Sequence, residues 1–137
     1  MRAVLVAIVV CACSRGGDGA LDEFHAGERR CLAAFNDALH RQGRNEIDEL
    51  ELADAIDHDV LPAWRTMRVH VEAAALPPDL AGPMHAYLAD RQAAWEAYVA
   101  ALHAPNDAAA APSYALYHRK DAEADADARR LAAVLPR

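Results

Sequence analysis

Residues 48–75 read DELELADAIDHDVLPAWRTMRVHVEAAA, and this stretch decides the fold class. Its apolar side chains recur every three or four positions, which is the spacing of one face of an α-helix. They are Leu50, Ala53, Val60, Trp64, Met67, Val71 and Ala74. Asp48 and Glu51 have the spacing of a capping box, with Asp in place of the usual Ser or Thr, and are expected to open the helix. Pro62 lacks a backbone donor and disfavours helical geometry at the preceding residue, so the helix is expected to kink or to break there.

Apolar side chains with the same spacing of three or four positions also occur on both sides of this stretch. They predict helices from 22 to 42, from a start between 79 and 83 to 103, and from 107 to 135. Gly43 is expected to terminate the first helix, and either Asp107 or Pro112 to open the last. Because short connections join all four, the sequence predicts an all-α, antiparallel up-and-down four-helix bundle whose second helix is kinked or broken at Pro62.

The composition supports a helical fold and excludes several classes of protein. Of 137 residues, 34 are alanine, the strongest helix former, whereas only 6% are aromatic. The length suggests a single domain. A charged fraction of 26% is too high for a protein with many membrane spans. The net charge of -7, with arginines scattered along the chain, argues against nucleic acid as a partner because phosphate contacts need clustered basic residues.

The N-terminal residues have the pattern of an export signal. Arg2 supplies a positive start, and residues 3–10 (AVLVAIVV) form an unbroken apolar run. Spanning a bilayer takes about 20 residues, so the run is too short for a membrane span but has the length of a signal-peptide core. Cys11, Ala12 and Cys13 follow it directly.

Val10-Cys11-Ala12-Cys13 resembles the lipobox of bacterial lipoproteins, which has an aliphatic residue, a tolerant position, a small residue and an invariant cysteine. The resemblance implies cleavage just before Cys13, a diacylglycerol on its thiol and acylation of the new amine. Val in place of Leu at the first position departs from the family pattern. The other register, with Cys11 lipidated, places the bulky Val10 at the cut and fits less well. The resemblance divides the chain into a signal peptide (1–12), a lipidated flexible tether (13–20) and a helical bundle domain (21–137).

The same resemblance gives the expected location. In enteric lipoproteins an Asp after the lipidated cysteine favours retention in the inner membrane, so Ser14 at this place favours the outer membrane. We therefore expect a cell-envelope protein that is anchored to the membrane through its lipid. Its domain is expected to face the periplasm or the cell exterior.

A second resemblance lies within the bundle domain. Asp59-Val-Leu-Pro-Ala-Trp-Arg65 and the Leu-Pro-Pro at 76–78 are similar to helical segments in uncharacterised lipoproteins and rhomboid-associated tails of myxobacteria-like species. Those segments imply no activity, and nothing in the chain resembles the rhomboid catalytic core.

The sequence offers no catalytic or metal-ligating pattern. Its seven histidines are scattered, and the chain contains no Glu-x-x-His, His-Glu-x-x-His or Cys-x-x-Cys, the spacings used by di-iron bundles, zinc proteases and many other metal sites. Ser14 and Ser113 are the only serines, and a glycine-rich phosphate loop is absent from the sequence. We therefore expect no metal, no cofactor and no catalytic residues in a protein that is not an enzyme.

One candidate ligand site remains, beside Pro62. Trp64 and Trp95 are expected to line a cleft there, and Arg65 and Arg68 to hold an acidic ligand or to pair with nearby carboxylates. Aromatic residues at helical spacing more often belong to the core, and that alternative stays open.

Residues 46–59 contain seven carboxylates and form the densest charged cluster. Acidic residues in the first turns of a helix complement its dipole, which favours a solvated face. A divalent cation bridged by Asp54, Asp57 and His58 is the alternative. Cys31, the one thiol left after cleavage and lipidation, is expected to be a small core residue.

These patterns predict a cell-envelope lipoprotein that presents a small, non-catalytic helical-bundle interaction module to an envelope protein partner. The alternative is a periplasmic bundle that binds a small ligand or a metal through the Pro62 region or the acidic cluster. The first hypothesis requires an exposed contact surface, whereas the second requires a lined cavity.

Overall fold

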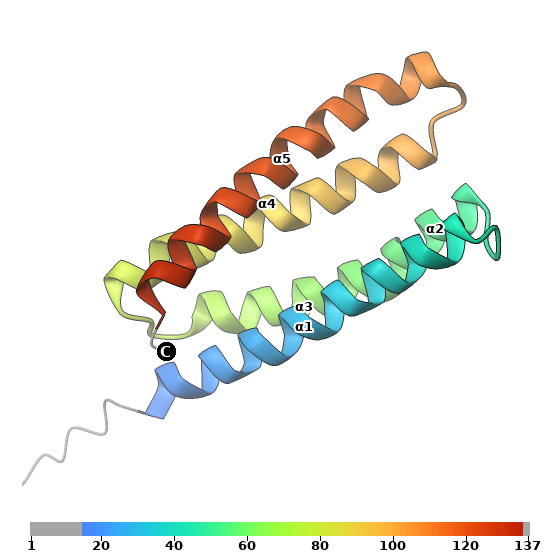
Figure 1. Ribbon diagram of the computed structural model, residues 1–137. Helices are drawn as coiled ribbons and strands as arrows, with labels where there is room; N and C mark the ends of the chain where they lie inside the picture. Colours follow the sequence, from blue (N-terminus) through green and yellow to red (C-terminus); the bar gives the residue numbers. More distant parts are fainter. Residues whose placement is uncertain (1–14, 136–137) are drawn as a thin grey trace, which may run out of the picture.

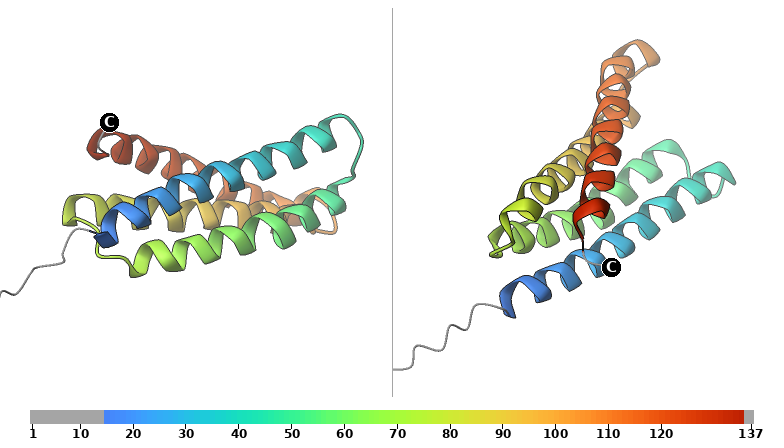
Figure 2. Two further views of the ribbon diagram at one scale, coloured as in Figure 1. Left: turned by 90° about the horizontal axis from the view of Figure 1, so that it is seen from below. Right: turned by 60° about the vertical axis from the view of Figure 1, so that its left-hand side comes forward.

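The computed structural model describes residues 15–135, which form an all-α bundle (Figures 1 and 2). The elements in chain order are α1 (Arg15–Gly43), α2 (Glu49–Ala55), the π-helical turn η1 (Ile56–Val60), α3 (Leu61–Ala73), α4 (Pro78–Leu102) and α5 (Asp107–Val134). No strand occurs among these residues, so the predicted all-α helical bundle is confirmed. The second predicted helix corresponds to α2, η1 and α3, which follow one another without a gap.

The bundle consists of two helical hairpins. In one, α1 packs against α2, η1 and α3, and in the other α4 packs against α5 (Figure 1). The hairpins meet where α2, η1 and α3 contact α4. Within residues 15–135, the Cα atoms of α5 come within 8 Å of α4 alone. The backbones of α1 and α5 therefore do not pack directly against each other.

The irregularity expected at Pro62 is a π-helical turn just before it. In this turn the Leu61 amide donates to the Ile56 carbonyl, five residues back. The wider turn relieves the clash that the proline ring would make with the carbonyl four residues earlier in a regular helix. Pro62 then occupies the first turn of α3, where its missing donor is tolerated. The break considered from the sequence does not occur, because the chain stays helical from Glu49 to Ala73.

Two helix ends test the predicted capping signals. Asp48 and Glu51 form the predicted capping box, since Asp48 Oδ1 accepts from the Glu51 amide at 2.8 Å and Glu51 Oε2 accepts from the Asp48 amide at 2.9 Å. Gly43, predicted as the first residue beyond the helix, is instead its last helical residue. The left-handed conformation falls at Asn45, whose φ is 57° and whose amide donates to the Gln42 carbonyl. Asn tolerates this conformation better than most residues because its short side chain bonds locally.

The helix α1 begins at Arg15, well before the predicted start at Asp22. Residues 15–20, expected to belong to the flexible tether, are therefore helical. Three of the first five residues are glycine, which disfavours a helix locally. Packing against the end of α3 explains the difference, because Ala20 is buried and a Cβ on Gly17 would lie 3.7 Å from the Ala75 carbonyl oxygen. Tertiary contact outweighs low helix propensity here.

Both helices of the second hairpin contain a proline near their start. α5 opens at Asp107, where the Asn106 side chain accepts from the Ala109 amide at 3.0 Å, so the alternative opening at Pro112 is wrong. α4 opens at Pro78, and Pro83 lies inside it. An internal proline removes one helical hydrogen bond, and the packing of this hairpin offsets that loss.

The core follows the length of the bundle and draws least on α5, which supplies none of its largest fully buried side chains. Its largest fully buried side chains are Trp64, Trp95, Tyr87, Leu52, Ile56, Leu61, Met84, Leu88, Val60, Val71 and Cys31. Cys31 is 1% exposed, and burial raises the pKa of its thiol. The prediction that Cys31 is a small core residue is confirmed.

Gly27 marks a close approach between α1 and α3. A Cβ at this position would overlap Sδ of Met67 and lie 3.0 Å from its Cγ. We expect Gly27→Ala to lower the free energy of unfolding by about 1–2 kcal/mol, because Met67 is buried and must shift to make room. Urea unfolding followed by circular dichroism measures the change.

Gly82→Ala in α4 is the matched control for this prediction. Nothing lies within 4 Å of a Cβ placed on Gly82, so the better helix former is expected to raise the free energy of unfolding by up to about 1 kcal/mol. Equal gains in the two variants would contradict the close packing of α1 on α3.

Candidate functional site

The two tryptophans predicted to line a cleft lie in the centre of the core. Trp64 is 0% exposed and Trp95 is 1% exposed, and their rings meet edge to face with centroids 4.9 Å apart. Trp64 Nε1 donates to the Leu88 carbonyl at 3.0 Å. Tyr87 packs on the Trp64 ring and Phe35 stacks on the Trp95 ring. Side chains packed in this way offer no surface to a ligand, so the two indoles form the junction between α3 and α4 and not the wall of a cleft.

Arg65 and Arg68 pair with neighbouring side chains on the outer surface of α3 and α4. Arg65 contacts Glu96 at 2.8 Å, and Arg68 contacts Glu72 at 2.7 Å and Gln92 at 3.2 Å. Burial acts to raise the pKa of Glu96, but hydrogen bonds from Arg65 and Gln92 outweigh it and leave that pKa lowered. The structure therefore places the predicted arginines in surface ion pairs, apart from the buried indoles.

The start of the predicted acidic cluster lines an open hollow of about 410 Å³ at the α1–α2 turn, formed by Gln42, Asn45, Glu46, Ile47, Asp48, Glu49 and Glu51. Several of these carboxylates have partners within the chain, because Arg44 binds Glu46 at 2.6 Å while Asp48 and Glu51 cap α2. Among residues 15–135, no group of three or more His, Cys, Asp or Glu side chains is placed to hold a metal ion. The surface termed the acidic end consists of Glu46, Asp48, Glu49, Glu51 and Asp107.

A smaller cleft of about 160 Å³ opens between α1, α4 and α5 near the start of α1. It is lined by Phe24, His25, Glu28, Tyr87, Ala128, Leu131, Ala132 and Leu135. Most of these side chains are apolar, and Glu28 is the one carboxylate among them. Pockets for small ligands commonly measure roughly 300–1,000 Å³, so this cleft has room for only part of such a ligand.

Beside this cleft, a polar network centred on Arg91 joins α4 to α5. The Arg91 guanidinium pairs with Asp121 and, at 2.8 Å, with Asp125, and it lies 5.7 Å from the centre of the Tyr87 ring. The Tyr87 hydroxyl donates to Glu28 of α1 at 2.6 Å, so the network reaches a third helix. Burial acts to lower the pKa of Arg91, but Asp125, Tyr87 and Asp121 outweigh this effect and leave the pKa raised. Burial, helped by Glu28, also raises the pKa of Tyr87.

The sequence contains a signal for this network that the predicted sites do not include. Arg91 falls on the apolar stripe of α4, between Leu88 and Trp95, and Asp121 falls on the stripe of α5. A charged residue on each of two apolar stripes indicates a buried ion pair. Pairing the two residues requires knowing which helices are neighbours, and periodicity alone does not supply that.

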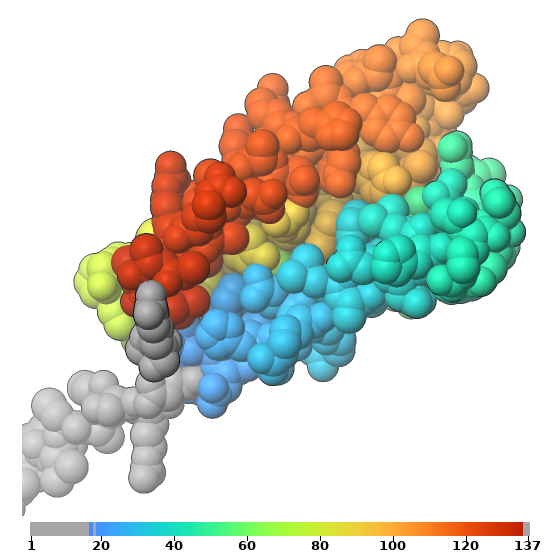
Figure 3. Space-filling model, viewed as in Figure 1, coloured from blue at the N-terminus to red at the C-terminus, as the bar shows by residue number. Residues whose placement is uncertain are grey.

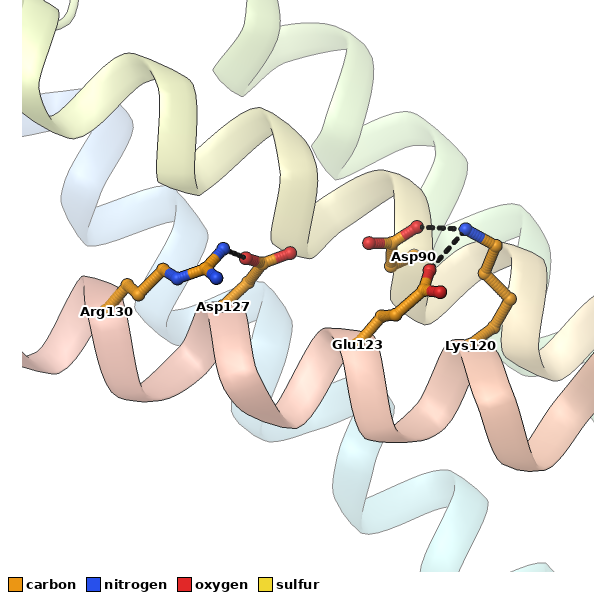
Figure 4. Close-up of polar contacts among 5 residues, drawn as sticks. All are labelled: Asp90, Lys120, Glu123, Asp127 and Arg130. Carbon is orange, nitrogen blue, oxygen red and sulfur yellow. Dashed lines mark hydrogen bonds and ion pairs between the residues drawn. The ribbon is translucent and has the colours of Figure 1, made fainter.

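Further ion pairs follow the contact between α4 and α5 (Figure 4). Lys120 binds Asp90 at 2.9 Å and Glu123 at 2.5 Å, and the buried Asp127 is bound by Arg130 at 2.7 Å. The buried apolar positions between the two helices include many alanines. They are Ala94, Ala97, Ala101, Ala110 and Ala124. Of these ion pairs, Lys120–Asp90 crosses from α5 to α4, whereas the other two lie within α5. Close packing of small side chains, this pair and the Arg91 network therefore hold the hairpin together.

A cluster of tyrosines joins α4 to α5. The space-filling view shows a groove between α1 and α5 with α4 as its floor (Figure 3). Tyr98 of α4 packs against Tyr114 and Tyr117 of α5, with ring centroids 6.1 and 4.8 Å away. Its ring also meets Phe35 of α1 at 6.2 Å. Burial raises the pKa of both Tyr98 and Tyr117, which are half-buried. Half-exposed tyrosines are typical of protein contact surfaces.

The end of the bundle opposite the acidic end has exposed apolar side chains beside the exposed carboxylates of Asp22, Glu23 and Asp79. The start of α1, the α3–α4 connection and the last turn of α5 lie together there (Figures 1 and 2). Val134 is 42% exposed, although it is a large hydrophobic side chain. The surface termed the apolar end consists of the exposed or half-exposed residues Ala75, Leu76, Pro77, Pro78, Ala132, Ala133, Val134 and Leu135. Exposed apolar surface of this kind marks a contact site.

No family model, curated protein or solved structure matches the chain. The function is therefore argued from the residues themselves. Cys13, the predicted lipidation site, and the whole predicted signal peptide lie outside the described residues. Across residues 15–135, none of the helices combines the length and the apolar character that a membrane span needs.

We expect Arg91→Met to lower the free energy of unfolding by about 2 kcal/mol. Met retains much of the side-chain length but removes the positive charge between Asp121 and Asp125, which then repel each other at a partly buried site. Urea unfolding measures the loss.

Arg65→Met is the matched control, because the Arg65–Glu96 pair is exposed and exposed pairs contribute little. A smaller loss is expected for this variant. If both variants lost the same stability, the Arg91 network would not be the polar centre of the α4–α5 hairpin.

Proposed function

We propose that the protein is a cell-envelope lipoprotein that presents a small, non-catalytic helical bundle as an interaction module. The observation that carries the proposal is the lipobox-like Val10-Cys11-Ala12-Cys13 directly behind an apolar run of signal-peptide length. Each buried CH₂ of a lipid contributes about 0.8 kcal/mol, so the two or three chains of a lipidated cysteine hold a protein firmly to a membrane. The expected location is the outer membrane, with the domain facing the periplasm or the exterior.

The start of α1 supports this role for Cys13. Only Ser14 separates Cys13 from Arg15, the first residue of α1. An extended chain covers at most about 3.6 Å per residue, so the bundle would be held within about 7 Å of the lipid-bearing residue. A module held this close to a bilayer is suited to contact with other proteins of the envelope.

The placement of polar side chains supports a binding role over a catalytic one. Among the described residues, the buried charged side chains are Arg91 and Asp127, and both face partners within the chain. The half-exposed tyrosines that join α4 to α5 supply apolar area together with hydroxyl groups that can bond to a partner. An envelope protein is therefore the expected partner, in addition to the membrane.

A second candidate function, binding of a small ligand, rests on one observation. This is the cleft of about 160 Å³ beside Tyr87 and Glu28. Its volume is about half the lower end of the roughly 300–1,000 Å³ range of ligand pockets, and the indoles expected to line a larger cleft are packed in the core. The interaction module is therefore the function that the geometry supports best.

Mass spectrometry of the protein extracted from membranes tests the anchor. We expect a mass equal to residues 13–137 plus acyl chains, because cleavage before Cys13 removes the signal. Cys13→Ala is expected to abolish lipidation and membrane association. Cys11→Ala is the matched control and is expected to keep both, because it leaves the lipid-bearing thiol in place.

An unmodified chain of 137 residues in the soluble fraction would contradict the proposal. A lipid found on Cys11 would contradict the register of the cleavage. Additional non-covalent mass on the native protein would favour the small-ligand candidate over the interaction module.

A further inference from the structure

The apolar end lies where the lipid anchor would attach. The start of α1 packs beside the α3–α4 connection, since a Cβ on Gly17 would lie 3.7 Å from the Ala75 carbonyl oxygen. The last turn of α5 lies beside α1 as well, because Leu135 and Phe24 line the same cleft. The first described turn of the chain and the exposed apolar residues therefore share one end of the bundle (Figure 1).

Two arginines border the apolar end. Arg129 and Arg130 are exposed on α5 directly before residues 131–135, which read LAAVL. The side chain of Arg130 is 70% exposed while it binds Asp127. Basic side chains beside exposed apolar ones suit a membrane interface, because the apolar groups enter the headgroup boundary while the guanidinium groups reach lipid phosphates.

The acidic end is denser in carboxylates, although Leu50 within it is 56% exposed, and it lies at the far end of the bundle (Figures 1 and 2). An anionic lipid surface would repel its carboxylates if this end approached the membrane. α1 has 29 residues and is therefore about 44 Å long. This length is several times the Debye length of about 8–10 Å. In a bundle that stands on its apolar end, salt therefore screens the repulsion between the lipid surface and the carboxylates of the acidic end.

We infer that the apolar end is a membrane-contact surface, which rests in the headgroup region of the bilayer that holds the lipid. The inference rests on the proposed anchor and adds a second point of attachment, made by Leu76, Pro77 and Val134. With two attachments the bundle stands on the membrane and its acidic end points into the aqueous phase. The cluster of Tyr98, Tyr114 and Tyr117 then stays accessible to a protein partner.

A fluorescent label that reports lipid contact tests the inference. The lipidated full chain suits this experiment, because Cys31 is buried and Cys13 carries the lipid, so an added cysteine is the site that reacts. Val134→Cys places an environment-sensitive nitrobenzoxadiazole label at the apolar end. Leu116→Cys on the same helix is the matched control, since Leu116 is 36% exposed and Val134 is 42% exposed. The two positions lie about 27 Å apart along α5.

The labelled proteins are reconstituted into vesicles of equal parts phosphatidylethanolamine and phosphatidylglycerol, and flotation of the vesicles is read first. Protein that fails to float overturns both the anchor and the membrane-contact surface. In floating samples, the label at Val134→Cys is expected to shift its emission to the blue and to be quenched by a lipid-borne quencher. The label at Leu116→Cys is expected to do neither.

Equal responses at the two positions would overturn the membrane-contact surface while leaving the anchor intact. Leu76→Cys gives a second reading, from the α3–α4 connection, and does not depend on the last turn of α5 staying helical. Its label is expected to respond as the one at Val134→Cys does. A label at Leu76→Cys that stays in water would contradict the inference in the same way.

Discussion

The contact between Trp64 and Trp95 holds the two hairpins together. Their rings meet with centroids 4.9 Å apart, and the Trp64 indole donates to the Leu88 carbonyl, so the polar N–H is buried without losing a partner. Burying about 150–250 Å² per aromatic ring at about 25 cal/mol per Å² contributes on the order of 5 kcal/mol each, before the entropy cost of ordering. Among the described helices the Cα atoms of α5 come within 8 Å of α4 alone, so the α4–α5 hairpin is placed in the bundle mainly through α4, with this junction at its centre.

The position of this junction explains both the groove between α1 and α5 and the apolar end, the two surfaces that support the proposed function. Because the hairpins join through α3 and α4, α1 and α5 face each other across a groove whose floor is α4 (Figure 3). Arg91 and Tyr87 connect the sides of this groove through ion pairs and a hydrogen bond to Glu28. The same connectivity gathers the start of α1, the α3–α4 connection and the last turn of α5 at one end, where Val134 is exposed (Figure 1).

Local patterns in the sequence predict the helices. The features that these patterns do not predict depend on contacts between residues far apart in the sequence. Asp48 and Glu51 are close in sequence, so their capping box was predictable. The early start of α1 depends on the end of α3, far along the chain, which the glycine-rich sequence does not reveal. For the candidate site, the stripes place Trp64 and Trp95 on the apolar faces of their helices, but their contact and complete burial depend on which helices are neighbours. Arg91 was missed for the same reason.

The central claim is that the tryptophan junction joins the two hairpins into one cooperative body. Trp64 and Trp95 are the only tryptophans of the chain, so their fluorescence reports the junction, while far-ultraviolet circular dichroism reports the helices. Urea unfolding followed by both signals tests the claim most directly. We expect coincident transitions with one midpoint, as for a two-state domain. A fluorescence transition at lower urea than the loss of helix would mean that the hairpins separate before they unfold, and would contradict a single cooperative body.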